Sequence, residues 1–213
     1  MYNSMQFNWS LFNRSPIVGI MRNISSEDIQ PIAAQYLAAG LSTLEVTFNS
    51  PNVEEQIATL ITEYGHELNI GAGTVCSMEE LDRALDVGAQ FIVTPILNPE
   101  VVKACVKANI PIFPGAFSPT EIYQAWTLGA DMVKVFPADT LGPNYIKNIK
   151  GPLNNIKILA TGGIHIHNID SYRSVGVQGF GMGSELFDKD LIRQKDWQGL
   201  KNHFLRFAQL FEI

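Results

Sequence analysis

The sequence predicts an α/β protein whose βα units close into a (β/α)8 barrel, the TIM-barrel architecture, and three observations support this prediction. Short apolar runs, most of them rich in β-branched residues, alternate with longer segments of helical periodicity, in the order strand then helix. The apolar runs are nearly continuous, as expected of parallel strands that are buried on both faces. Eight such runs occur, and eight is the number of strands that a barrel of this class contains.

The expected strands are Pro16–Arg22, Thr43–Phe48, Asn69–Thr74, Phe91–Pro95, Pro111–Pro114, Met132–Phe136, Ile156–Ala160 and Gly179–Gly183. An open doubly wound sheet is the alternative. It is disfavoured because no G-x-G-x-x-G pattern opens the first βα unit.

Segments with helical periodicity separate these strands, and several begin on Ser or Asn, have an acid in the first turn and end near Gly. That order matches the chemistry of helix caps. The clearest segments are Ser25–Gly40, Asn52–Gly65, Ser77–Ala89, Asn98–Asn109 and Ser118–Ala130. We also expect a short N-terminal helix over Asn8–Asn13 that caps one end of the barrel, and an amphipathic C-terminal helix over Trp197–Phe211.

Composition places the chain among globular proteins of one domain, covering residues 1–213. Hydrophobic residues make up 46% and charged residues 17%, which is enough apolar material for a packed core. The net charge of −6 gives no basic surface for nucleic acid or an anionic membrane. The sequence shows no signal peptide and no run of about 20 apolar residues that could span a membrane. Cys76 and Cys105 have no disulfide-dense spacing, so we expect reduced thiols and a cytoplasmic protein.

Polar residues recur near the ends of the expected strands, where barrel enzymes build their active sites. Any one of them could be an ordinary strand-end residue, but their recurrence in several units favours a site. These residues are Arg22, Glu45, Asn49, Thr74, Thr94, Lys134, Thr161 and Ser184.

Lys134 stands between Val133 and Val135 in a strand that reads as buried. Burying an ammonium is costly unless it is paired or loses its proton, and a neutral lysine is a usable nucleophile towards a ketone. Glu45 also lies inside an apolar strand, so the two could form an imine-forming amine beside a general acid or base. The alternative is a buried ion pair without chemistry, which is a weak stabilising device.

Two glycine motifs, TGGI at 161–164 and GMGS at 181–184, follow the expected seventh and eighth strands. Loops at these two places often bind phosphate in this barrel class, and we expect a helix to begin after Ser184 and add its dipole. The alternative is that the glycines only form tight turns. His165 and His167 could ligate a metal, but no carboxylate partner accompanies them locally, so solvent-facing loop histidines are favoured.

Seven motifs in this order resemble the class I aldolases of 2-keto-3-deoxy-6-phosphogluconate (KDPG) and 2-keto-3-deoxy-6-phosphogalactonate (KDPGal). They are LEVTFNSP, GAGTV, FIVTP, FPGAFSPTE, VKVFPADTLGPNYIK, TGGI and GMGS, and the similarity covers residues 16–186. The resemblance implies a metal-independent lyase without a cofactor, which cleaves a phosphorylated keto sugar acid to pyruvate and glyceraldehyde 3-phosphate. It also implies a homotrimer.

The resemblance assigns a role to each residue of the expected site. Lys134 would form the Schiff base, and Glu45, through a water, would take the C4 hydroxyl proton. The residues that would bind substrate are Arg22, Thr74, Pro95, Phe136 and Asn49, of which Arg22 and Thr74 would hold the pyruvate carboxylate. The phosphate would be bound by Gly162, Gly163, Gly183 and Ser184.

The sugar epimer is the finer question. The segment Phe48-Asn49-Ser50-Pro51 and the GPNYIK segment resemble the galactonate type, whereas Arg22-Asn23 departs from the Arg-Gly typical of it. We therefore favour KDPGal over KDPG, with 4-hydroxy-2-oxoglutarate as a further candidate substrate. Two other classes stay open: a phosphate-binding barrel isomerase or synthase, and a non-catalytic sensor of phosphosugar acids. The presence of both Lys134 and Glu45 disfavours the sensor.

Overall fold

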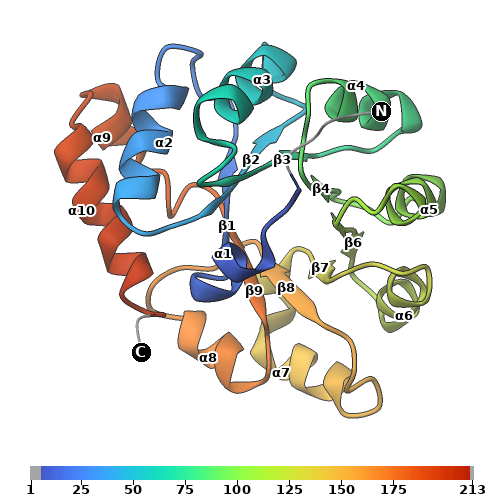
Figure 1. Cartoon of the computed structure of the whole chain (residues 1–213). Helices are drawn as coiled ribbons and strands as arrows, with labels where there is room; N and C mark the ends of the chain where they lie inside the picture. Colours follow the sequence, from blue (N-terminus) through green and yellow to red (C-terminus); the bar gives the residue numbers. More distant parts are fainter. Residues whose placement is uncertain (1–5, 212–213) are drawn as a thin grey trace.

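The computed structural model describes residues 6–211, and a ring of parallel strands surrounded by helices makes up this part of the chain (Figure 1). The strands are β1 Ile17–Met21, β2 Thr43–Thr47, β3 Asn69–Gly73, β4 Ile92–Val93, β5 Ile112–Phe113, β6 Gly115–Ala116, β7 Val133–Val135, β8 Ile158–Thr161 and β9 Gly179–Met182. Their order in the sheet is β5-β4-β3-β2-β1-β9-β8-β7-β6, and every pairing is parallel. The predicted barrel class is confirmed.

The fifth predicted strand, Pro111–Pro114, is found as β5, and a further short strand that was not predicted, β6, begins directly after Pro114. β5 pairs with β4, whereas β6, directly after Pro114, pairs with β7. Proline has no N–H and cannot donate to a ladder, but its carbonyl can still accept, and the Lys134 N–H donates to the Pro114 carbonyl at 2.9 Å. Since β5 and β6 are separated only by this residue, the ring of strands closes there.

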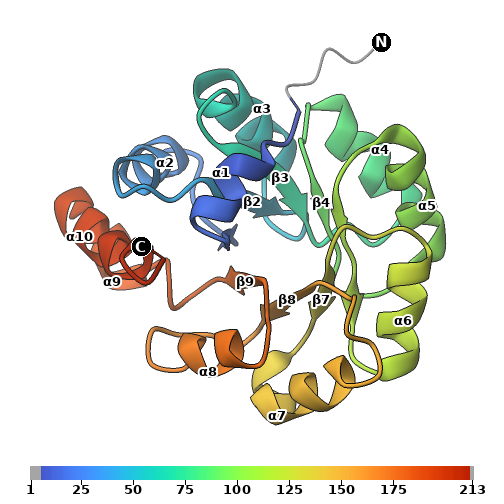
Figure 2. The same cartoon turned by 60° about the horizontal axis from the view of Figure 1, so that its bottom comes forward.

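The helices lie outside the strands, except for α1, which lies at one end of the ring (Figures 1 and 2). Their bounds are α1 Trp9–Arg14, α2 Ile29–Ala38, α3 Val53–Tyr64, α4 Met78–Asp86, α5 Pro99–Ala108, α6 Pro119–Thr127, α7 Ala138–Lys150, α8 Ile169–Ser174, α9 Lys189–Arg193 and α10 Trp197–Ala208. Ser77 and Ser118 form capping boxes with Glu80 and Glu121, as the sequence pattern predicts. No helix among the described residues is long and apolar enough to cross a membrane.

The apolar side chains form an outer layer between strands and helices and a smaller inner cluster within the ring. The inner cluster consists of Phe7, Phe12, Val18, Phe91, Val93, Phe113, Met132 and Leu159. Phe12, on α1, is fully buried against this cluster, and the Asn8 N–H donates to Asn69 Oδ1 of β3 at 2.7 Å. The predicted N-terminal cap is therefore confirmed, and it leaves the opposite end of the ring for the polar strand ends.

Candidate active site

The polar strand-end residues gather at one end of the ring because all strands run parallel and their carboxyl ends meet there. Glu45 lies within β2 and Lys134 within β7, whereas Arg22 follows β1, Thr74 follows β3, and the two glycine motifs end or follow β8 and β9. Barrel enzymes place their active sites at this end. The α1 cap closes the other end.

Lys134 faces the interior of the ring. Its neighbours Val133 and Val135 are fully buried in the outer layer, and side chains alternate along a strand, so Lys134 points the opposite way. Its partner in β8 is Leu159, a member of the inner cluster. Only 4% of Lys134 is exposed, and its Nζ lies 5.3 Å from the centre of the Phe136 ring.

Glu45 also faces inward, and 1% of it is exposed. Gly73 on the neighbouring strand gives its carboxylate room: a Cβ at Gly73 would lie 2.6 Å from Glu45 Cδ, so a larger residue there would displace the carboxylate. Glu45 Oε2 has no hydrogen-bond partner within residues 6–211. Such a buried, unpartnered oxygen is an available proton acceptor.

The electrostatics of this pair favour an uncharged lysine. Burial lowers the pKa of Lys134, and this is the largest effect. The negative charge of Glu45 partly offsets it, whereas the positive charge of Arg22 lowers the pKa further. Burial likewise raises the pKa of Glu45, and the charges of Lys134 and Arg22 oppose that increase. No salt bridge joins Lys134 to Glu45 in the described part of the chain. The arrangement thus places a nucleophilic amine and a proton acceptor close enough to influence each other electrostatically, with an arginine that influences both.

Arg22 and Thr74 occupy the mouth of the site. Arg22 is exposed, and it is near enough to influence the pKa values of both buried groups. Thr74 is half-buried, with a φ of +61°. That backbone conformation is unusual for a β-branched residue and occurs most often where surrounding structure enforces it, as at functional sites.

The remaining predicted pocket residues divide between two sides of the mouth. Pro95 and Phe136 line a shallow cavity of about 370 Å³ together with residues of the loop after β6. Asn49 is exposed in the turn after β2, where the next residue, Ser50, accepts a 2.9 Å hydrogen bond from the Asn23 N–H. Thr94, another predicted candidate, uses its hydroxyl for the Ile96 carbonyl and the Gly115 N–H instead, so its polar atoms serve the local backbone.

Asp139, at the start of α7, lies against the first glycine loop, and the sequence analysis did not single it out. Gly162 and Gly163 follow β8 with φ values of +96° and +67°, and the Asp139 N–H of α7 donates to the Gly162 carbonyl at 3.1 Å. The Asp139 side chain packs directly on Gly163: a Cβ at Gly163 would lie 2.6 Å from Asp139 Cγ and 2.7 Å from its Oδ2. An acid therefore stands beside the predicted phosphate loop.

The expected helix after Ser184 is wrong. Ser184 is exposed in a turn, and the Leu186 and Phe187 N–H groups both donate to the Gly183 carbonyl at 2.9 Å. α9 begins only at Lys189, because Asp188 caps it by accepting from the Asp190 and Leu191 N–H groups. The N-terminal dipole of that helix is therefore displaced from Ser184.

His165 and His167 lie in the loop after β8. The His165 N–H donates to Asn168 Oδ1 at 2.9 Å, and Asn168 Nδ2 donates to the Gly163 carbonyl at 2.8 Å. Among residues 6–211, no group of three or more His, Cys, Asp or Glu side chains could hold a metal ion. The two histidines therefore belong to a loop held by Asn168.

Cys76 is a site residue that sequence reasoning missed. It is half-buried near the end of β3, and it influences the pKa of Lys134 while Lys134 influences that of Cys76. Burial, with the charge of Glu80, raises the pKa of the thiol. The sequence could have indicated Cys76, because it lies two residues after Thr74, near the end of a predicted strand.

Comparison with known proteins identifies the family. Residues 10–203 match the family model described as "KDPG and KHG aldolase". The chain belongs to this aldolase family. It is 34% identical over 173 residues to the 2-dehydro-3-deoxy-6-phosphogalactonate aldolase of Escherichia coli strain K12, covering 81% of this chain and 84% of that protein. It is 38% identical over 183 residues to the 2-dehydro-3-deoxy-phosphogluconate aldolase of Haemophilus influenzae, covering 85% of each.

A solved relative adds chemical information about this aldolase family. The KDPG aldolase from Legionella pneumophila superposes with a TM-score of 0.85 and 29% identity, covering 92% of this chain and 95% of that one. That structure holds pyruvate, captured at low pH as a covalent carbinolamine intermediate. A carbinolamine forms when an amine adds to a carbonyl, so this aldolase belongs with the Schiff-base lyases.

Proposed function

We propose that this aldolase cleaves 2-keto-3-deoxy-6-phosphogalactonate to pyruvate and glyceraldehyde 3-phosphate, with residues 1–213 acting as one barrel domain. Lys134 is the Schiff-base residue and Glu45 the proton acceptor in this proposal. The observation that carries it is the buried pair itself: an amine whose pKa is lowered by burial faces the same interior as a carboxylate with an unpartnered oxygen. A buried pair kept only for stability is disfavoured, since such pairs stabilise proteins weakly.

The reaction begins when neutral Lys134 Nζ attacks the C2 carbonyl of the sugar acid. Loss of water from the carbinolamine leaves a protonated imine between Nζ and C2. Glu45, through a water, takes the proton of the C4 hydroxyl, and the C3–C4 bond breaks. The electron pair of that bond becomes the C2–C3 double bond of an enamine, and the imine nitrogen becomes neutral. Glyceraldehyde 3-phosphate leaves, C3 of the enamine takes a proton, and water hydrolyses the imine to release pyruvate and regenerate Lys134.

The surrounding residues hold the two ends of the substrate. Arg22 binds the carboxylate next to the imine, because a guanidinium suits a planar oxyanion, and Thr74 adds a hydrogen bond there. Pro95 and Phe136 form the apolar wall, and Asn49 contacts the sugar hydroxyls. Backbone N–H groups of the loops at Gly162, Gly163 and Gly183, with the Ser184 hydroxyl, bind the phosphate.

The gluconate epimer is the second candidate, and 4-hydroxy-2-oxoglutarate the third. The identity to a phosphogluconate aldolase, 38%, favours the second, and the family description that includes KHG favours the third. The Asn49-Ser50-Pro51 turn after β2 favours the galactonate epimer. Ser50 supports that turn by hydrogen bonding to Thr47 Oγ1 at 2.9 Å as well as to the Asn23 N–H.

We also propose a cytoplasmic homotrimer that acts on small metabolites and binds neither nucleic acid nor membrane. The two free cysteines suit a reducing compartment. Exposed apolar side chains at Ile96 and Phe117 suit an interface between copies. Sedimentation equilibrium measures the oligomeric state directly.

Two variants test the assignment of roles. Glu45→Gln should slow cleavage of the phosphorylated galactonate acid by roughly 10²-fold, the usual scale for loss of a general base, while the imine with pyruvate still forms. Lys134→Met should abolish both cleavage and imine formation. The measurements are a coupled assay for released glyceraldehyde 3-phosphate on both epimers and mass spectrometry for the pyruvate adduct. Wild-type cleavage by Lys134→Met would refute the mechanism, whereas faster turnover of the gluconate epimer would refute only the choice of substrate.

A further inference from the structure

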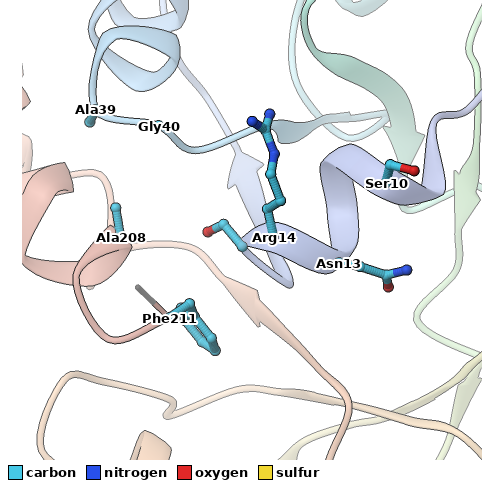
Figure 3. Close-up of a pocket in the computed structure, with 8 residues that line it drawn as sticks. Ser10, Asn13, Arg14, Ala39, Gly40, Ala208 and Phe211 are labelled. Atoms are coloured by element: carbon cyan, nitrogen blue, oxygen red, sulfur yellow. The ribbon is translucent and has the colours of Figure 1, made fainter. Parts of the chain in front are cut away.

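A second cavity, of about 630 Å³, lies at the end of the molecule opposite the candidate active site. It is formed by α1, the turn that follows α2 and the end of α10 (Figure 3). The residues that line it are Ser10, Asn13, Arg14, Ser15, Ala39, Gly40, Ala208 and Phe211. None of them belongs to the residues assigned to catalysis.

Arg14 is the only charged residue in this lining, and no acid accompanies it. Within the described residues its guanidinium has no ion pair. In Figure 3 its side chain extends from α1 toward the turn at Ala39 and Gly40. An unpaired arginine in a concave site favours an oxyanion, because its planar fork binds carboxylate or phosphate with two hydrogen bonds.

The nearby Arg173 is already engaged. Its Nη1 lies 3.3 Å from Asp170 Oδ1, its Nη2 donates to the Leu210 carbonyl at 2.6 Å, and its guanidinium stacks 4.6 Å from the Phe211 ring centre. Arg173 therefore fixes the Phe211 wall of the cavity from one side. Arg14 is the cation that a ligand can reach.

Ser15 gives a second, independent indication of a ligand. It is 4% exposed, and its Oγ has no hydrogen-bond partner among residues 6–211. Leaving a buried hydroxyl unpaired costs free energy, so native proteins seldom do so without a reason. A ligand oxygen bound by Arg14, the adjacent residue, could also accept a hydrogen bond from this hydroxyl.

We propose that this cavity, defined by Arg14, Ser15 and Phe211, is a binding site for a small organic oxyanion. The carboxylate or phosphate of the ligand pairs with Arg14 and Ser15. Its apolar part packs on Phe211, Ala208 and Ala39. Phe12 of the same helix packs on the inner cluster, so a ligand that holds α1 stabilises the barrel as well as occupying the site.

Phenyl phosphate is a suitable probe because it joins an oxyanion to an apolar ring. It is titrated into the ¹⁵N-labelled full chain while amide shifts are followed by TROSY spectra, and thermal unfolding is recorded in parallel. The ligand controls are inorganic phosphate, which retains only the oxyanion of the probe, and phenol, which retains only its apolar ring. The variants are Arg14→Gln and Ser15→Ala. Arg193→Gln is the matched control, since Arg193 is exposed and pairs only locally with Asp190.

We expect saturable shifts at residues 10–15, 39–40 and 208–211, together with a higher unfolding temperature. Arg14→Gln should weaken binding about tenfold or more, and Ser15→Ala about threefold, whereas Arg193→Gln should leave it unchanged. The proposal is overturned if no saturable shift occurs at these residues, if shifts are confined to the loops after β8 and β9, or if Arg14→Gln binds as tightly as the wild type. Because the readout needs no turnover, the result is independent of the proposed catalytic function.

Discussion

Arg22 acts on both members of the buried pair, although it is exposed itself. Its positive charge lowers the pKa of Lys134 and lowers that of Glu45. The first effect increases the fraction of neutral amine at a given pH, and the second keeps the carboxylate able to accept a proton. In the proposed mechanism, Arg22 thus contributes through its charge as well as through contact with substrate.

The pH dependence of imine formation tests this effect. Arg22→Gln removes a cation whose presence lowers the pKa of Lys134, so the pKa of Lys134 should rise and the neutral fraction should fall at any pH below it. The rise of the imine-formation rate with pH should therefore move to higher pH. The measurement is the rate at which the borohydride-trapped adduct forms at saturating pyruvate, recorded as a function of pH.

Arg193→Gln, which changes the net charge equally but far from the pair, is the control and should leave the profile in place. An unchanged profile for Arg22→Gln would show that the charge of Arg22 does not reach Lys134. A fall in rate without any movement along the pH axis would assign Arg22 to substrate contact alone.

At the level of single residues, Lys134 and Glu45 could be predicted because each is a charge within an apolar strand. Whether they point into the barrel or toward the helices could not be predicted, because these strands are buried on both faces; in the structure both point inward. Asp139 could not be predicted in the same way. Its place beside Gly163 depends on two consecutive glycines with positive φ and on a helix from another unit, neither of which leaves a local pattern in the sequence.

At the scale of elements, the loops after β8 and β9 determine what the phosphate end can bind. Asp139 adds a negative charge next to Gly163, and α9 begins too late to direct its dipole at Ser184. In the proposed site, phosphate binding therefore depends on backbone N–H groups and the Ser184 hydroxyl, without the helix dipole that the sequence suggested. A single hydroxyl should therefore have a measurable effect.

Ser184→Ala should raise the Michaelis constant for the phosphorylated sugar acid about three- to tenfold, because one hydrogen bond to a charged group is lost. The Michaelis constant for 4-hydroxy-2-oxoglutarate, which has no phosphate, should not change. Steady-state kinetics on both substrates make the comparison within one variant. Ser174→Ala, on α8, is the control. Equal changes for the two substrates would place Ser184 outside the phosphate site.

Helices with a clear capping motif were predicted well, whereas elements whose pattern is interrupted by glycine or proline were not. The capping boxes at Ser77 and Ser118 start α4 and α6 as expected. α7 was not predicted as a helix because Gly142, with a φ of +69°, and Pro143 interrupt its pattern with a kink. The short strand β6 was not predicted because Pro114, directly before it, indicates the end of a strand and not the start of pairing with another strand.

At the scale of the whole molecule, α1 closes the barrel and links its stability to the N-terminal segment. Phe12 is fully buried, with ring centres of Trp9, Phe7 and Phe113 at 5.9, 6.0 and 6.2 Å. Removing a large side chain from such a cluster leaves a cavity that rigid strands cannot fill. Barrel closure and the inner cluster therefore depend on one another.

Phe12→Ala should lower the free energy of unfolding by about 3–5 kcal/mol, the usual cost of deleting a buried aromatic ring. Urea denaturation followed by circular dichroism measures the change. Tyr123→Ala removes a ring that is 54% exposed and should cost much less. Equal losses for the two variants would mean that α1 is not part of the cooperative core.

The barrel and its polar end were predictable as a whole because βα alternation and parallel pairing leave few topologies. The cavity at Arg14 was not. It is assembled from α1, the end of α2 and the end of α10, which are distant in sequence and contribute no shared motif. Such a site becomes visible only once the elements have been placed together.

Lys134, as we propose, is a nucleophile kept neutral by the barrel interior. The most direct test incubates the protein with pyruvate and borohydride, then measures the intact mass and maps the modified peptide. We expect one reduced pyruvate adduct per chain, on Lys134, and none in Lys134→Met. A folded wild-type protein without an adduct, or with the adduct on another lysine, would contradict this proposal.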